Sequence, residues 1–390
     1  ARPGQPARPG QPAHPGQPAQ PGQPATVGRP APGGQMAEPV VPRETELVSL
    51  RPDWFRYAPF SLYGLATILV TAGLGFRILN EARLRPEQLG PVHGAVDQIS
   101  RAPLGLAITE VALGAIVLIA LFSTLGYLLA FWGFRLSRTD TGTLHVARGL
   151  VTTRAITIEE RRLRGVELSE PALLRLVGGA RLLAITTGVR AGAGAERGGS
   201  LLCPPAPRGT VLDVGEHLTG HPNPLRAPLT THGPRAARRR FTRALVPTAL
   251  LIAALAAASQ WLGAPGYLWR DALVLLPLAA LLAVGRVRSL GHAIVGSTLV
   301  ARQGALNRRH SALAAAGIVG WTLHQSYFQR RAGVATLAAT TAAGRQHYDL
   351  LDVPLPTAVR VADRMTPDLL TPFLVPPTGA GGTVPLTPGR

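Results

Sequence analysis

Four long apolar runs constrain this chain more than any other feature of its sequence. They lie at Pro59 to Leu79, Leu106 to Phe134, Phe241 to Leu262 and Leu268 to Val284. An α-helix rises about 1.5 Å per residue, so about twenty apolar residues cross the hydrocarbon core of a bilayer. Because the runs come in two pairs, they predict two transmembrane hairpins rather than a water-soluble core.

The segments that follow the two hairpins resemble each other. A shift of 155 residues without a gap places Gly149 on Gly304 and Gly178 on Gly333, and it relates about forty residues from Leu144 to Thr187 to a second set. A period of this length is too long for a solenoid repeat. The sequence therefore indicates a duplicated unit that consists of a membrane hairpin followed by a small domain.

Both small domains contain short apolar stretches between turn residues, a pattern typical of β-strands. In the first domain, we expect strands at Thr143 to Val146, Ala155 to Ile158, Gly165 to Leu168, Arg181 to Thr186 and Thr210 to Val214. In the second, we expect strands at Thr298 to Arg302, Gly317 to His324, Val334 to Thr340 and Gln346 to Leu350, and a closing helix at Pro356 to Met365. The glycine-rich stretch from Gly188 to Gly199 predicts a flexible loop.

The predicted organisation is that of an α+β membrane protein with seven segments. They are a Pro/Gly/Gln/Ala-rich tail (1–50), the first hairpin (51–136), the first small domain (137–222), a basic linker (223–240), the second hairpin (241–286), the second small domain (287–374) and a flexible tail (375–390). The first tail repeats Pro-Gly-Gln-Pro-Ala with a period of six residues and has nothing apolar to bury, so we expect it to be disordered. A role as a tether or as an adaptor ligand is the alternative.

The charge of the chain favours an anionic membrane surface as its partner. All 40 basic residues are arginine, against 21 acidic residues, and the formal net charge is +19. With long apolar runs present, phospholipid headgroups are favoured over nucleic acid. The single Cys203 excludes an intramolecular disulfide and metal sites built from several cysteines.

Arginines lie on the flanks that the positive-inside rule compares. They precede the first and third apolar runs and follow the second and fourth, at Arg51, Arg56, Arg135, Arg138, Arg235, Arg238, Arg239, Arg240, Arg243, Arg286 and Arg288. This distribution predicts four spans in the inner (plasma) membrane with both termini and both small domains in the cytoplasm.

The segment Gln325 to Leu337, QSYFQRRAGVATL, resembles the signature of the bacterial pleckstrin-homology-like (PH-like), membrane-flanked domains. The first copy is degenerate, because Pro171 and Leu174 replace the Ser and the second Gln. The resemblance implies that each copy is a seven-stranded, partly open barrel with a C-terminal capping helix. That helix would be Pro356 to Met365 in the second copy and Asp213 to Leu218 in the first.

The signature residues have a structural interpretation. The motif residues that we single out are Gln325, Phe328, Gln329, Gly333 and Gly178. The glycines permit a tight turn or a positive φ. Phe328, and Leu173 at its place in the first copy, are expected to pack under the sheet.

No catalytic motif occurs in the sequence. There is no phosphate-binding loop of the Walker type, no HExxH, no GxSxG and no cysteine pair. His324, His347 and Asp349 lie in one region, but their separation favours ordinary surface residues over a metal or acid–base group. We therefore predict no enzyme activity, cofactor or metal.

Basic residues are the better candidates for a binding site. They are Arg308, Arg309, Arg330 and Arg331 in the second copy, with Arg161, Arg162 and Arg175 in the first. A cytoplasmic domain next to the bilayer experiences its negative surface potential, so these arginines could contact lipid headgroups or a partner. The alternative is that they are solvated arginines in a protein without lysine.

The leading hypothesis is a non-enzymatic membrane protein whose two PH-like domains act as interaction, assembly or lipid-surface modules, in envelope stress tolerance or export. Self-association and other membrane proteins are the expected partners besides lipid. The alternative is a transporter or export component that uses the spans as a pathway. The spans contain few polar residues for such a route, namely Thr67, Thr71, Ser123, Thr124 and Ser259.

Overall fold

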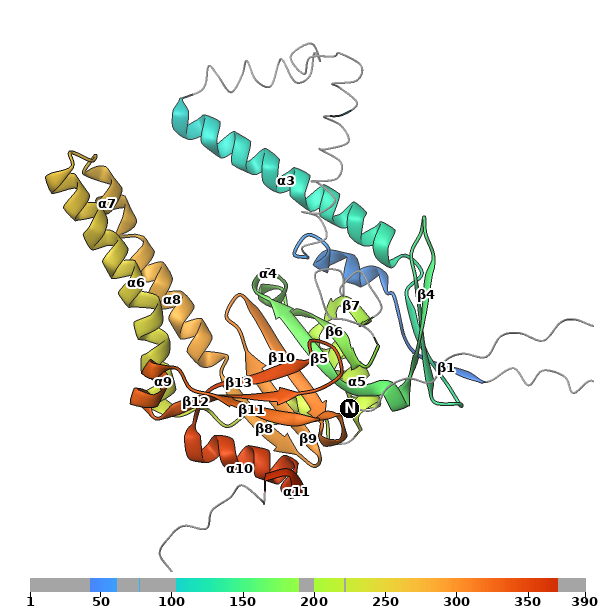
Figure 1. Ribbon diagram of the computed structural model, residues 1–390. Helices are drawn as coiled ribbons and strands as arrows, with labels where there is room; N and C mark the ends of the chain where they lie inside the picture. Colours follow the sequence, from blue (N-terminus) through green and yellow to red (C-terminus); the bar gives the residue numbers. More distant parts are fainter. Residues whose placement is uncertain (1–42, 62–76, 78–102, 189–199, 221, 371–390) are drawn as a thin grey trace, which may run out of the picture. The chain divides into compact units, whose positions relative to one another are not determined.

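The structure is a computed structural model that describes residues 43–61, 77, 103–188, 200–220 and 222–370 (Figure 1). The chain divides into two units at residues 41 and 42, and all described residues belong to the second. Most of the first apolar run, Pro59 to Leu79, lies outside the described residues, as do residues 1–42 of the first predicted tail, the whole second tail and residues 189–199 of the glycine-rich loop.

The elements follow one another in two sets of the same order. The first set is β1 (Glu44–Ser49), η1 (Pro52–Tyr57), α3 (Leu104–Phe131), β2 (Arg135–Thr139), β3 (Thr143–Arg148), β4 (Arg154–Glu159), η3 (Glu160–Arg162), β5 (Leu163–Pro171), α4 (Ala172–Leu176), β6 (Gly179–Thr186), β7 (Leu201–Pro207) and α5 (Arg208–Thr219).

The second set begins with η4 (Pro224–Arg226), α6 (Gly233–Trp261), α7 (Tyr267–Ala272) and α8 (Leu275–Arg288). It continues with β8 (Gly291–Val295), β9 (Thr298–Gln303), β10 (Asn307–Ala314), η5 (Ala315–Gly317), β11 (Gly320–His324), α9 (Tyr327–Ala332), β12 (Val334–Thr340), β13 (His347–Pro354), α10 (Leu355–Met365) and α11 (Pro367–Leu370). Each copy therefore has two three-stranded meanders and a closing helix, which confirms the predicted duplication.

The two copies share one sheet. Their strands form a four-stranded sheet β1-β2-β3-β4, a six-stranded sheet β7-β6-β5-β10-β9-β8 and a three-stranded sheet β11-β12-β13. Strand β5 of the first copy pairs antiparallel with β10 of the second, from Pro171 opposite Asn307 to Gly165 opposite Leu313 (Figure 1). A Cβ atom at Gly165 would lie 2.1 Å from the carbonyl oxygen of Ala312, so the copies can approach this closely only at a glycine.

The repeat is also visible in the backbone. Gly149 and Gly304 have φ of 111° and 98°, and a Cβ at either would lie within 2.2 Å of the carbonyl oxygen three residues further on. Gly178 and Gly333 have φ of 73° and 66°. The shift of 155 residues seen in the sequence thus relates turns of the same conformation.

Several predicted elements differ from those observed. Thr210 to Val214 was expected to be a strand, and this is wrong, because these residues lie in α5, which packs on β5, β6 and β7 of the six-stranded sheet and buries Val211, Leu212 and Val214. Within the described residues, each copy contributes six strands, β2 to β7 and β8 to β13, whereas the resemblance implied seven. The four-stranded sheet gains a further strand because β1 pairs with β2. The prediction of disorder for 1–50 is therefore wrong at its end, where Glu44–Ser49 form this strand. The predicted closing helix at Pro356 to Met365 corresponds to α10.

Among the residues that the structure describes, two helical segments are long and apolar enough to cross a membrane. They are Gly233–Trp261, which is α6, and Tyr267–Arg288, which contains α7 and α8. Helices α6 and α8 pack against each other, and many of their large apolar side chains, such as Leu250 and Leu281, are exposed. Within α3, the apolar segment Ile116–Phe131 is shorter than either of these two segments.

Candidate functional site

The signature segment folds into a capped turn of helix followed by a strand. Ser326 is the N-cap of α9: its hydroxyl accepts from the Gln329 amide, and the Gln329 side chain accepts from the Ser326 amide at 3.0 Å. This reciprocal capping box stabilises the first turn of a helix. Gly333 ends α9 in the left-handed conformation, and β12 begins at the next residue.

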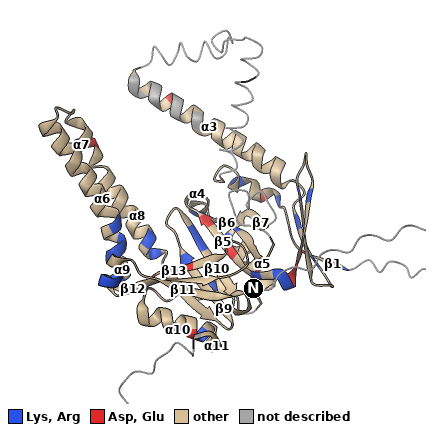
Figure 2. Ribbon diagram, viewed as in Figure 1, with Lys and Arg blue, Asp and Glu red and all other residues tan. Residues whose placement is uncertain are grey.

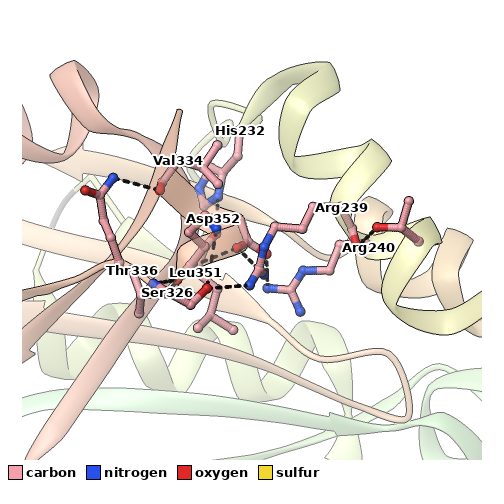
Figure 3. A network of polar contacts seen from close by, with 11 residues as sticks. His232, Arg239, Arg240, Ser326, Val334, Thr336, Leu351 and Asp352 are labelled. Carbon is pink, nitrogen blue, oxygen red and sulfur yellow. Dashed lines mark hydrogen bonds and ion pairs between the residues drawn. The ribbon is translucent and has the colours of Figure 1, made fainter. Parts of the chain in front are cut away.

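The buried side chain of Gln329 links this helix to β12 and β13. Its Nε2 donates to Thr336 Oγ1 at 2.9 Å and to Asp352 Oδ1 at 3.0 Å. The Nε2 of Gln325 donates to the carbonyl oxygen of Val334 at 3.0 Å (Figure 3). The two glutamines of the signature therefore hold α9 on its own sheet.

Asp352 is the centre of the network in Figure 3. It is 1% exposed and has a φ of 55°, a conformation that aspartate adopts more readily than most residues. The pairing of β12 with β13 shifts between Ala335 and Leu337, so Leu351 and Asp352 form a bulge. A bulge redirects a side chain out of the strand pattern, and this one presents the carboxylate to α6.

Two arginines of α6 neutralise this buried carboxylate. Arg239 Nη1 donates to Asp352 Oδ1 at 2.7 Å, and Arg240 Nη2 lies 2.7 Å from Oδ2, although the second contact lacks the alignment of a hydrogen bond. Arg239 Nη2 also donates to Ser326 Oγ at 3.3 Å. A buried charge is tolerated only when it is paired, so this ion-pair group fastens the start of α6 to the second copy.

A histidine pair lies beside this attachment. The ring Nδ1 of His232 lies 2.7 Å from the Leu351 carbonyl oxygen, and His292 Nδ1 lies 3.1 Å from His232 Nε2. Burial lowers the pKa of His232, and burial together with His232 lowers the pKa of His292 to about 4. Both rings are therefore neutral at pH 7, and His232 can donate to Leu351 while it accepts from His292.

A second group of ion pairs joins the two copies across β5 and β10. Glu167 lies 3.7 Å from Arg309 Nε and also contacts Arg345. Glu170 lies 2.6 Å from Arg208 Nε, 4.0 Å from Arg308 Nη1 and 3.7 Å from His310 Nε2.

His310 is neutral in this group of charges. Its pKa is lowered to about 3, first by burial and then by Arg302, Arg208 and Arg308. The nearby carboxylate of Glu170 opposes this shift, but burial and three guanidinium groups outweigh one anion.

The structure places the seven predicted arginines at three locations. Arg308 and Arg309 lie on β10 near the glutamates of β5, and Arg175 of α4 donates to the carbonyl oxygen of Ala305 at 3.3 Å. Arg161 and Arg162 are exposed and pair with Glu159. Arg330 and Arg331 are exposed on α9.

Two expectations about apolar and titratable residues can be compared with the structure. Phe328 is 72% exposed and Leu173 is 55% exposed, so the expectation that they pack under the sheet is wrong. Both lie on the outer side of a short helix, α9 or α4, whose inward position is taken by Gln329 or Leu174. His324, His347 and Asp349 form no metal-ligating group with each other in the part of the chain that the structure describes.

Sequence reasoning did not identify Asp352, Glu167 and Glu170. Arg239 and Arg240 were noticed only as part of a basic cluster that sets membrane topology. The available signal was that an acidic residue occurs in the apolar stretch Leu350 to Val353, where a charge must have a partner.

Comparison with known proteins agrees with the duplicated architecture. A family model described as "Bacterial PH domain" matches residues 89–204 and 244–367, which is more than half of the chain. No curated protein and no solved structure matches. The first match ends within β7, and the second contains Ser326, Gln329 and Asp352 of the network but begins after Arg239 and Arg240. The chain therefore belongs to the bacterial PH domain family and carries two copies of that domain.

Proposed function

We propose that this protein is a non-catalytic, membrane-anchored module in which two hairpins, with four spans, hold two PH-like copies against the cytoplasmic face of the plasma membrane. The observation that carries the proposal is the attachment of α6 to the second copy through Asp352, Arg239 and Arg240. Helix α6 is long and apolar enough to cross a bilayer. A domain fastened to its first turns would remain at the membrane surface.

The short helix α9 supplies a surface suited to lipid. Tyr327 and Phe328 are exposed and pack edge to face, and Arg330 and Arg331 follow them. Aromatic side chains prefer the headgroup region, and arginines are attracted to anionic lipid. Helix α9 contacts α6, and Figure 2 shows basic positions on α9 and in the first turns of α6.

The first copy offers a related surface at the same place in the repeat. In α4, Leu173 and Leu176 are exposed and Arg175 lies between them. Apolar side chains on the outer side of both short helices support a common role in lipid contact. Helix α4 of the first copy has more apolar residues, and α9 of the second copy has more arginines.

Fluorescent labelling can test whether α9 contacts the bilayer. The natural Cys203 is fully buried, and burial raises the pKa of its thiol, so it should not react. A Phe328→Cys variant of the full chain in nanodiscs, labelled with an environment-sensitive dye, should show a blue-shifted emission and protection from a water-soluble quencher.

A matched control lies in the same copy. Val319 is 68% exposed and precedes β11, whereas α9 follows the other end of that strand. The Val319→Cys label should remain accessible to the quencher. Equal quenching of the two labels in nanodiscs of anionic lipid would contradict the proposed contact.

A further inference from the structure

A basic cavity of about 360 Å³ lies where α6 and α8 meet the second copy of the domain. Four arginines from four segments line it: Arg240 of α6, Arg286 of α8, Arg309 of β10 and Arg345 of the turn between β12 and β13. The rest of the lining consists of the β9–β10 turn, Gln303 to Asn307, and three leucines outside it, Leu282, Leu290 and Leu351. A cavity with both basic and apolar walls is suited to an anion that carries an apolar group.

The carboxylates around the cavity do not balance its arginines. Asp352 pairs with Arg240 but also with Arg239 outside the cavity, and Glu167 is shared by Arg309 and Arg345. Arg286 has no ion pair among the described residues. Two carboxylates thus face five guanidinium groups, and the excess of positive charge persists at neutral pH because arginine does not deprotonate in proteins.

One donor in the cavity wall is also unsatisfied. The Nε of Arg240 is buried and has no hydrogen-bond partner, although its Nη2 lies against Asp352. Buried donors normally have partners, and an orphaned donor of a cation suggests a missing acceptor. Phosphate oxygens match guanidinium geometry and accept several such bonds at once.

The position of the cavity indicates where that acceptor comes from. Arg286 lies in the last turn of α8, and Leu282 lies one turn earlier on the same helix, within the segment that is apolar enough to cross a membrane. A ligand there would place its charge at the end of the span and its apolar part along Leu282.

We propose that this cavity binds the phosphate group of an anionic membrane lipid. The inference rests on the proposed attachment of the domains to the bilayer, and it adds a specific site that the α9 surface does not contain. In this site, Arg286, Arg309 and Arg345 contact the phosphate, and Arg240 adds positive charge to the cavity wall. The lining comes from α6, α8 and the second copy, and Glu167 of the first copy pairs with Arg309 and Arg345 of that lining.

Binding can be measured on the full chain in detergent by the concentration-dependent rise of its unfolding temperature. The probes are short-chain phosphatidic acid, short-chain phosphatidylcholine and glycerol 3-phosphate. Arg286→Gln removes a guanidinium group that has no carboxylate partner, so folding should be unaffected. Arg288→Gln is the control, because it makes the same charge change two residues away and does not line the cavity.

We expect saturable binding of phosphatidic acid that is about tenfold weaker in Arg286→Gln and within about twofold of the unaltered protein in Arg288→Gln. Phosphatidylcholine, which has no net charge, should bind more weakly. If glycerol 3-phosphate competes at similar concentrations, the site recognises soluble phosphate esters, and if it does not, the lipid headgroup is the ligand. Equal weakening by both substitutions, or no saturable binding of phosphatidic acid and glycerol 3-phosphate, would overturn the site. Neither result depends on the α9 label, so failure of this site and failure of the proposed function can be told apart.

Discussion

Replacement of Asp352 by asparagine tests the attachment between α6 and the second copy. Asparagine keeps the shape of the side chain, tolerates the φ of 55° and can still accept from Gln329, but it removes the negative charge. Arg239 and Arg240 would then be two cations without a carboxylate, with side chains only 12% and 13% exposed.

The magnitude follows from the burial of the three groups. Removing one partner of a fully buried ion pair costs about 3–5 kcal/mol because the remaining charge is left unpaired. The two arginines retain some access to water and one Asp352 contact lacks hydrogen-bond alignment, so we expect about 2–3 kcal/mol. For a protein of this size, 1 kcal/mol shifts the unfolding temperature by roughly 2–4 °C. Asp352→Asn should therefore lower it by about 4–12 °C in detergent micelles.

Two further variants separate this mechanism from a general effect of charge removal. Asp349→Asn makes the same change on the same strand, where the described residues form no ion pair with Asp349, and it should shift the unfolding temperature by less than about 2 °C. A triple variant with Asp352→Asn, Arg239→Gln and Arg240→Gln removes the unpaired charges and should recover part of the loss. The reasoning is refuted if Asp352→Asn unfolds at the same temperature as Asp349→Asn.

Three other predictions concern the rest of the fold. The pKa of His310 is lowered to about 3, so the unfolded chain binds a proton more readily than the folded protein. The contribution of His310 to the free energy of unfolding should be complete above about pH 6.5 and fall as the pH decreases towards 3, by about 2 kcal/mol at pH 5. Denaturant titrations at several pH values should show that the free energy of unfolding depends less steeply on pH in a His310→Asn variant. Gly304→Ala places a Cβ 2.0 Å from a carbonyl oxygen at a φ of 98° and should cost at least about 1–3 kcal/mol in thermal unfolding, whereas Gly320→Ala has no neighbour within 4 Å and should cost less than 1 kcal/mol. Tyr127→Phe leaves the Pro205 carbonyl oxygen, which lies 2.8 Å from the tyrosine hydroxyl, without this donor and should cost about 1–3 kcal/mol by the same measurement.

The repeat and the closing helix α10 could be predicted because their signals are local. Turn glycines, alternating apolar residues and a strongly amphipathic segment retain their meaning without knowledge of the fold. Strand β10 could not be predicted in this way, since it begins Asn307-Arg308-Arg309-His310-Ser311 and has no apolar alternation. It becomes a strand because β5 and β9 pair with it on both edges and because Glu167 and Glu170 neutralise its charges.

The candidate site depended on information that a linear pattern does not contain. The burial of Asp352 follows from a bulge in β13, and a bulge is determined by how β12 pairs with that strand. Arg239 and Arg240 satisfy the positive-inside rule as well as any other arginines, so nothing in their spacing distinguished a buried ion pair from a topology signal. Only the contact between α6 and β13 makes that distinction.

Each copy is attached to an apolar helix, α3 or α6, at the same point of the fold, by different chemistry. In the first copy the pairing of β6 with β7 shifts between Ala180 and Leu182, which leaves Pro204 and Pro205 in a bulge equivalent to that of Leu351 and Asp352. There, Tyr127 of α3 donates its hydroxyl to the carbonyl oxygen of Pro205.

This difference explains why the signature of the first copy departs from the family pattern. Gln329 of the second copy donates to Asp352, and its counterpart Leu174 is buried in the first copy, where a proline occupies the place of the aspartate. A buried glutamine amide beside Pro205 would have no carboxylate to accept from it, and an unpaired buried amide costs about 1–3 kcal/mol. The loss of the glutamine is therefore the expected companion of an attachment that uses aromatic packing and one hydroxyl in place of an ion pair.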